Sequence, residues 1–69
     1  MKVLDDPRAV RLKVGLNQSQ FWGRIGTTQS AGSRYENGRK LPPPVEKLLV
    51  LAYGTDKQSS DLLSQVRRA

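Results

Sequence analysis

The sequence predicts an all-α protein, a compact bundle of five short helices, and three observations lead to this fold class. Gly and Pro divide the 69 residues into five segments of helical length, most of them flanked by residues suited to begin or end a helix. Apolar residues follow no strand-like alternation with polar ones in any of these segments. A chain of this length can bury only one thin core, so we expect a single domain over residues 1–69.

The first helix is expected over residues 7–14. Asp6 precedes it as a candidate N-cap, and Pro7 suits the first helical position because the N–H group that it lacks is not needed there. Gly15 can take the left-handed conformation that ends a helix. The apolar residues available to one face are Ala9, Val10 and Val14.

The second and third helices are expected over residues 18–25 and 29–37. Asn17 and Gln20 have the spacing of a capping box before the second helix. Gly26 is placed to end that helix, and Thr28 offers a cap for the next one.

The last two helices follow a Pro-rich loop. The final proline of residues 42–44 can open the fourth helix and Gly54 can end it. The fifth helix is expected within residues 59–69, with a Ser cap, an acidic first turn and two arginines in its last turn, which suits the helix dipole.

The composition is basic and lacks most groups that perform catalysis. Twelve Lys and Arg against six Asp and Glu give a formal charge of +6 and a pI near 10.4. This charge favours nucleic acid as a partner, and an anionic membrane surface after it. Cys and His are absent, which excludes a disulfide, a thiolate metal site and the usual general base. We therefore expect no enzyme, no metal and no cofactor.

A cytoplasmic location is expected. The longest unbroken apolar stretch, residues 48–53, is far shorter than the about 20 residues of a membrane-spanning helix. The N-terminus has no apolar region of the secretory type. No effector pocket for a small molecule is evident.

Two helices joined by Gly26-Thr27-Thr28 form a helix, a tight turn and a helix, an arrangement used by DNA-binding repressors. The segment GLNQSQFWGRIGTTQSAGSRYENGRKLP, residues 15–42, resembles the phage repressor and Cro family of helix-turn-helix proteins, also called the XRE family. The resemblance implies a lambda-repressor-like DNA-binding domain whose second and third helices form the helix-turn-helix.

Two positions depart from the pattern of that family. The family usually has Ala after the apolar residue of the second helix and Ile or Val in the middle of the third. Here Trp22 and Gly32 stand at these positions. We expect the indole to fill the volume that Gly32 vacates, because interiors tolerate conserved volume better than lost volume. The alternative is that Trp22 is exposed and Gly32 breaks the third helix.

The N-terminal part of the third helix is expected to meet base edges in the major groove. Gln can pair with adenine, Arg with guanine, and the methyl group of Thr can contact a thymine methyl group. The candidate base-reading residues are Thr28, Gln29, Ser30, Ser33 and Arg34. Gln29 is the strongest of them, because in the resembling repressors the matching Gln reads a base. Thr28 is ambiguous because a helix cap uses its hydroxyl locally.

Other polar residues are expected to hold the DNA backbone. The candidates for phosphate contacts are Asn17, Gln18, Asn37, Arg39 and Lys40. The resemblance implies that Gln18 contacts phosphate and braces Gln29, and that Arg11 and Glu36 form a structural ion pair between the first and third helices. The alternative for Arg39 and Lys40 is a solvated loop.

We interpret the chain as a transcriptional regulator that binds duplex DNA, possible partners being a second copy of the chain or another protein. Leu62, Leu63 and Val66 of the last helix are open to two interpretations: a dimer contact or closure of the domain's own core. A protein-binding adaptor or an antitoxin-like module on the same fold is the main alternative. Binding driven by charge alone, without sequence preference, is a third.

Overall fold

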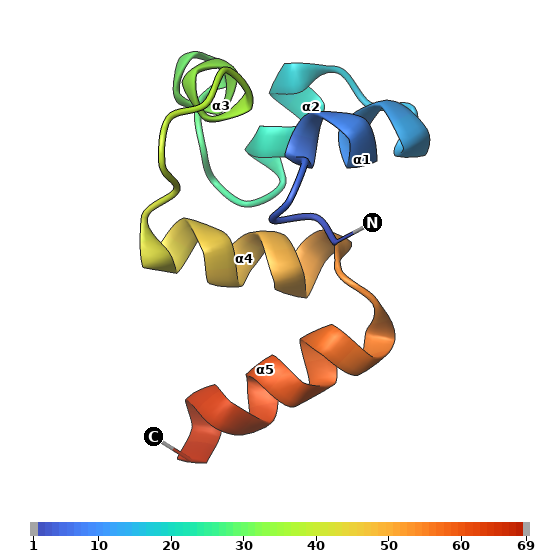
Figure 1. The fold of residues 1–69 in the computed structure, drawn as a ribbon, viewed down its shortest axis with the longest axis vertical. Coiled ribbons are helices and arrows are strands. Elements are labelled where there is room, and N and C mark those ends of the chain that lie inside the picture. The colour runs from blue at the N-terminus through green and yellow to red at the C-terminus, as the bar shows by residue number, and fades with distance from the viewer. Residues whose placement is uncertain (1, 69) are drawn as a thin grey trace.

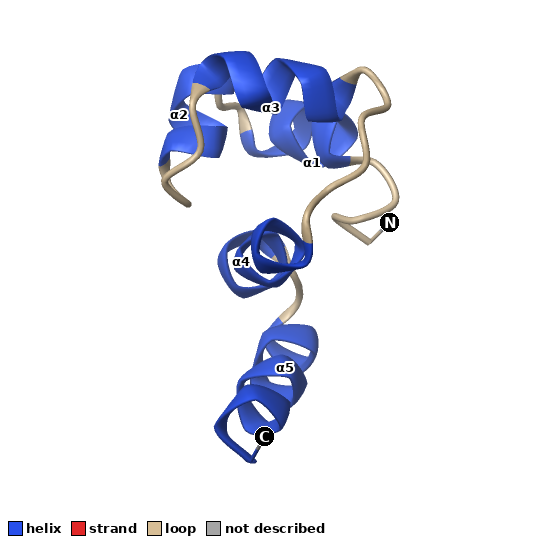
Figure 2. Cartoon of the chain, turned by 90° about the vertical axis from the view of Figure 1, so that its left-hand side faces the viewer, coloured by secondary structure: helices blue, strands red, loops and turns tan. Residues whose placement is uncertain are grey.

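The computed structural model describes residues 2–68, and this part of the chain contains five α-helices and no strand, which confirms the all-α class. The helices are α1 Pro7–Val14, α2 Gln18–Gly23, α3 Gln29–Glu36, α4 Pro43–Tyr53 and α5 Asp56–Arg68. The first three helices gather above α4, and α5 extends from the opposite side of α4 (Figures 1 and 2).

The first two helices begin as the sequence indicates. The side chain of Asp6 accepts a hydrogen bond from the backbone N–H of Ala9 at 3.0 Å, and Gly15 ends α1 with a φ of 77°. Asn17 and Gln20 form a reciprocal capping box, with donor–acceptor distances of 2.8 and 3.0 Å. These bonds satisfy backbone groups that a short helix would otherwise leave unpaired.

The second helix is shorter than expected. It ends at Gly23 instead of Ile25, because the N–H groups of Ile25 and Gly26 bond to the carbonyls three residues back, at 3.2 and 3.0 Å. This tighter turn ends at Gly26, whose φ is 77°. At α3 the difference is one residue, since Asn37 is the C-cap and not part of the helix.

The starts of the last two helices also differ from the sequence prediction. The fourth begins at Pro43, one residue early, so that two prolines occupy its first turn, where no N–H donor is required. The prediction of a Ser cap for the fifth helix is wrong. Thr55 and Gln58 form a capping box there, at 3.1 and 2.9 Å, and α5 begins at Asp56.

The core lies between α2, α3 and α4. Its buried side chains are Val3, Phe21, Trp22 and Leu49. The ring of Phe21 stacks on that of Tyr53 at a centroid distance of 4.0 Å and meets the indole of Trp22 edge to face at 5.3 Å. The hydroxyl of Tyr53 donates to the carbonyl oxygen of Phe21 at 2.6 Å. Phe21 of α2 is thereby anchored on Tyr53 of α4, and Trp22 packs beside it.

The tryptophan fills the space beside the glycine of α3. The side chain of Trp22 is 0 % exposed, and α3 runs through Gly32 without a break. A Cβ atom built on Gly32 would lie 2.3 Å from two indole carbons, Cδ1 and Cγ. The expectation that the indole fills the volume left by Gly32 is therefore confirmed, and the alternative of an exposed indole is wrong.

The fifth helix does not close the core. It contributes no buried residue and packs against α4. Leu62 is partly buried there, whereas Leu63 and Val66 are 47 % and 49 % exposed. On α4, Leu48 and Leu51 are similarly exposed. No helix within residues 2–68 is long and apolar enough to cross a membrane.

Candidate nucleic-acid interface

The segment from α2 to α3 is a helix-turn-helix. A short turn joins the two helices, which pack against each other. The N–H of Thr27 donates to the carbonyl oxygen of Trp22 at 3.0 Å, which holds the end of the turn against α2. The buried indole then sets how closely α3 approaches α2. In Figures 1 and 2, α3 lies at the top of the molecule, and no helix covers its upper side.

Four of the five expected base-reading residues line one open hollow on α3. Gln29, Ser30 and Arg34 are exposed, and Ser33 is half-buried. Gln18 of α2 completes the hollow. This is a polar surface of donors and acceptors, the kind of surface that can pair with base edges.

Thr28 lies outside the hollow, at the N-cap of α3. Its hydroxyl oxygen accepts the N–H of Ala31 at 3.2 Å, so one of the lone pairs of Thr28 is used inside the protein. The side chain is exposed, which leaves its methyl group and its hydroxyl proton at the surface.

The amide of Gln29 is held by two neighbours from α2. Its Nε2 donates to Oε1 of Gln18 at 3.5 Å, and its Oε1 accepts from the hydroxyl of Ser19 at 3.4 Å. The contact between the two glutamines matches the bracing that the family resemblance implied. Sequence reasoning missed Ser19, and no signal in the sequence indicated that this residue of α2 would also contact Gln29.

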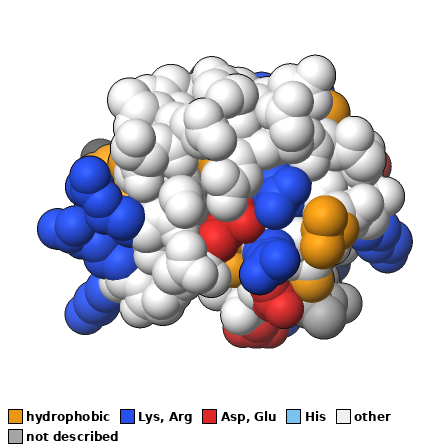
Figure 3. All heavy atoms as spheres, turned by 90° about the horizontal axis from the view of Figure 1, so that it is seen from above, with side chains coloured by type: hydrophobic (Ala, Val, Ile, Leu, Met, Phe, Trp, Pro, Cys, Tyr) orange, Lys and Arg blue, Asp and Glu red, His pale blue; other side chains and the backbone are white. Residues whose placement is uncertain are grey.

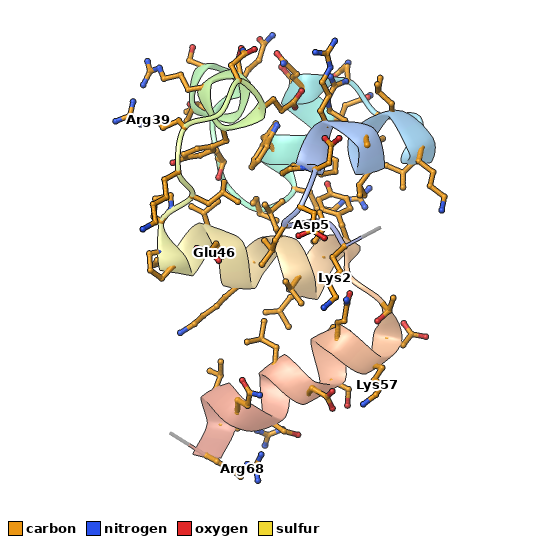
Figure 4. The ribbon with its side chains drawn as sticks, in the orientation of Figure 1. Lys2, Asp5, Arg39, Glu46, Lys57 and Arg68 are labelled. Atoms are coloured by element: carbon orange, nitrogen blue, oxygen red, sulfur yellow. The ribbon has the colours of Figure 1, made fainter. Side chains whose placement is uncertain are left out.

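Basic side chains gather at the C-terminal end of α3. Arg34, Arg39 and Lys40 line a second hollow together with apolar and aromatic neighbours. The chain leaves α3 through a Schellman motif, in which the N–H of Arg39 bonds to the carbonyl of Arg34 at 3.0 Å and Gly38 has a φ of 102°. This turn fixes the point from which Arg39 projects outward (Figure 4). In Figure 3 the top surface is mostly uncharged, with Lys and Arg side chains at its left and right edges and also, beside acidic side chains, near its centre.

The two asparagines expected at phosphates have local roles as well. Asn17 accepts the N–H of Gln20 as part of the α2 capping box. Nδ2 of Asn37 donates to the carbonyl oxygen of Ser33 at 2.8 Å, at the end of α3. Both side chains are exposed, and each keeps hydrogen-bonding capacity beyond these caps.

Arg11 and Glu36 form an ion pair that joins α1 to α3. Nε and Nη2 of Arg11 lie 2.9 and 3.0 Å from the two carboxylate oxygens, and the Glu36 side chain is only 2 % exposed. Nε1 of Trp22 donates to Oε2 at 2.7 Å, and Nε2 of Gln18 approaches Oε1 at 3.4 Å.

Burial by itself would raise the pKa of Glu36. The hydrogen bonds to Arg11, Trp22 and Gln18, together with the charge of Arg11, outweigh that effect and lower the pKa below the ordinary value of 4.5. Sequence reasoning missed the bond from Trp22, although a signal existed: a buried indole N–H needs an acceptor, and Glu36 lies one helical turn beyond Gly32 on the same helix.

Among the residues that the structure describes, no three His, Cys, Asp or Glu side chains are grouped as metal ligands.

A two-helix motif with an uncovered helix, an exposed polar hollow and a basic end defines the helix-turn-helix class of DNA-binding domains.

Comparison with protein families agrees with this class. The family model described as the RsaL-like HTH domain matches residues 8–52, which span α1 to nearly the end of α4. The chain belongs to this family. The match supports a helix-turn-helix DNA-binding domain, while narrower membership of the repressor and Cro family stays a prediction. Searches of curated proteins and of solved structures gave no significant match.

Proposed function

We propose that this protein is a transcriptional regulator that recognises specific duplex DNA by placing α3 in the major groove. The observation that carries the proposal is the hollow formed by Gln18 and by four polar residues of α3 beside a basic helix end. A helix fits the major groove, and only there do all four base pairs differ in their donors and acceptors.

The side chains of the hollow suit particular bases. Gln29 can form two hydrogen bonds with adenine, and Arg34 can form two with guanine. Ser30 and Ser33 offer hydroxyls that suit any base, and the methyl group of Thr28 can contact thymine. Each two-bond pair contributes about 1 to 3 kcal/mol of discrimination against the wrong base.

Phosphate contacts then fix the register of α3. Arg39 and Lys40 follow the end of α3 and can hold one strand, while Gln18 and Asn17 at the start of α2 can hold the other. One N–H of Gln18 points at Glu36, so its second amide proton is available for a phosphate oxygen.

We also propose a two-fold dimer formed through α4 and α5. The apolar side chains of Leu48, Leu51, Leu63 and Val66 are each between 42 % and 49 % exposed, which a second copy would cover. Two subunits would bind half-sites about 10 bp apart. Replacing Leu63 and Val66 by Ser should shift the wild-type dimer to monomer in sedimentation equilibrium. A wild-type protein that sediments only as a monomer would contradict this contact.

Selection of binding sites from a random duplex pool tests the function directly. Enrichment of a defined sequence, with two-fold symmetry if the protein is a dimer, is the result that we expect. Binding without enrichment that moderate salt abolishes would favour contacts driven by charge alone. No binding to duplex DNA would favour a protein-binding adaptor.

A further inference from the structure

The carboxylate of Glu36 is surrounded by hydrogen-bond donors from two helices, α1 and α2. Oε2 receives Nε of Arg11 and Nε1 of Trp22, and Oε1 receives Nη2 of Arg11 and Nε2 of Gln18. The donors of Arg11 and Trp22 cannot be exchanged for acceptors, because neither side chain has an acceptor on those atoms. Only the amide of Gln18 could turn over.

An ionised carboxylate only accepts hydrogen bonds, and this fixes the direction of the amides beyond it. Gln18 must turn its NH2 group to Glu36, so its oxygen faces Gln29. Gln29 must then turn its own NH2 group to Gln18, and its oxygen faces the hydroxyl of Ser19. The chain of bonds therefore has one direction from the buried carboxylate to the surface of α3.

We infer that Glu36 is a positioning residue for specificity: held by Arg11 and Trp22, it sets the amide orientation of Gln29 through Gln18, and this orientation makes the protein select adenine. The inference rests on the proposed function, in which Gln29 contacts a base. Glu36 itself is 2 % exposed at its side chain and acts through other residues.

Adenine suits the amide orientation that this chain of hydrogen bonds imposes on Gln29. After the bonds to Gln18 and Ser19, the Gln29 amide keeps one N–H and one lone pair on its oxygen. These can pair with N7 and N6–H2 of one adenine. If the amide turned over in the same place, donor would face donor and acceptor would face acceptor, and the preference would be lost.

Glu36→Gln should reverse the direction of the hydrogen bonds from residue 36 through Gln18 to Gln29, while barely changing the shape of the side chain at position 36. The new amide oxygen would take the place of Oε2, because two donors that cannot turn point there. Its NH2 group would then face Gln18, whose oxygen would turn toward it, and the bond from Nη2 of Arg11 to Oε1 would be lost. Gln29 would in turn present its oxygen to Gln18, the wrong orientation for adenine.

The test uses the full chain and a selected duplex in two versions, with adenine or with guanine at the position that depends on Gln29. The measured quantity is the ratio of the two affinities. Loss of folded protein lowers both affinities by the same factor and cancels in this ratio. We expect a ratio of about 5- to 150-fold for the wild type. For Glu36→Gln it should fall to the low value of Gln29→Ala.

Two matched variants separate orientation from packing. Gln18→Met, at the first residue of α2, removes the amide that links Glu36 to Gln29. It should lower the affinity ratio as Glu36→Gln does. Phe21→Leu loosens the packing of α2 against α4 but leaves every donor to the Glu36 carboxylate in place, so its ratio should stay within about twofold of the wild type.

The outcomes distinguish the inference from the function beneath it. A preference that Gln29→Ala abolishes and Glu36→Gln retains would overturn the relay alone. An equal loss of preference in Phe21→Leu and Glu36→Gln would show that the packing of α2, and not the relay, sets the preference. A wild-type preference that survives in Gln29→Ala would also overturn the relay alone, whereas a wild-type protein without any sequence preference would overturn the proposed function and the relay together.

Discussion

Replacing Gly32 by Ala should destabilise this protein, although Ala is the better helix former. In an ordinary helix interior the exchange stabilises by about 1 kcal/mol. Here the added Cβ would lie 2.3 Å from Cδ1 and Cγ of Trp22 and 2.7 Å from Cδ2. Carbon atoms in contact are about 3.5 to 4.0 Å apart, so either the indole or the helix must move.

The indole has little freedom to yield. It is 0 % exposed, and its Nε1 is 2.7 Å from Oε2 of Glu36. Overpacking a core costs about 1 to 3 kcal/mol, and this contact belongs at the upper end. Subtracting the propensity gain of about 1 kcal/mol leaves a net loss of about 2 kcal/mol. For a domain of this size, that loss lowers Tm by about 8 to 16 °C.

Urea unfolding followed by far-UV circular dichroism measures the effect. The control is Gly23→Ala at the end of α2, where an added Cβ meets nothing within 4 Å; it should be neutral or slightly stabilising. Gly32→Val should destabilise further, and Trp22→Ala should relieve that clash in the double variant. A stabilising Gly32→Ala, or free energies of unfolding that add within about 0.5 kcal/mol in the double variant, would refute the exchange of volumes.

Two further predictions concern charge. Because the folded-state pKa of Glu36 is lowered, its contribution to stability is complete above the ordinary value of 4.5 and is lost as the pH falls through the folded-state pKa. Glu36→Gln should lose this part of the pH dependence when acid unfolding is measured. An unchanged pH profile in the variant would contradict this prediction. Replacing Arg39 or Lys40 by Ala should lower the dependence of log affinity on log salt concentration by about 1 each. Lys57→Ala on α5, a side chain 85 % exposed, is the control and should leave this slope unchanged.

Much of the fold could be predicted because its signals are local. Caps such as Asp6 and Asn17, and a left-handed Gly15, depend on residues within a few positions of one another. The exchange between Trp22 and Gly32 could also be predicted, because both departures from a family pattern fall at positions that touch.

The position of α5 and the contacts of single polar atoms could not be predicted. The apolar residues of α5 suit burial against its own core or against a second copy equally well, and only the structure shows Leu63 half exposed. Burial of Val3 gave no periodic signal, because the residue lies in a turn outside any helix. The partner of Ser19 depends on the angle between α2 and α3, which the sequence does not specify.

The central claim is that Gln29 reads adenine in the major groove, and one affinity measurement tests it most directly. The selected duplex is compared with one that carries 7-deazaadenine at the position assigned to Gln29, a change that removes only the N7 acceptor. Wild-type binding should weaken about 5-fold or more, whereas Gln29→Ala should bind both duplexes equally. Equal weakening in both proteins, or none in the wild type, would contradict the account.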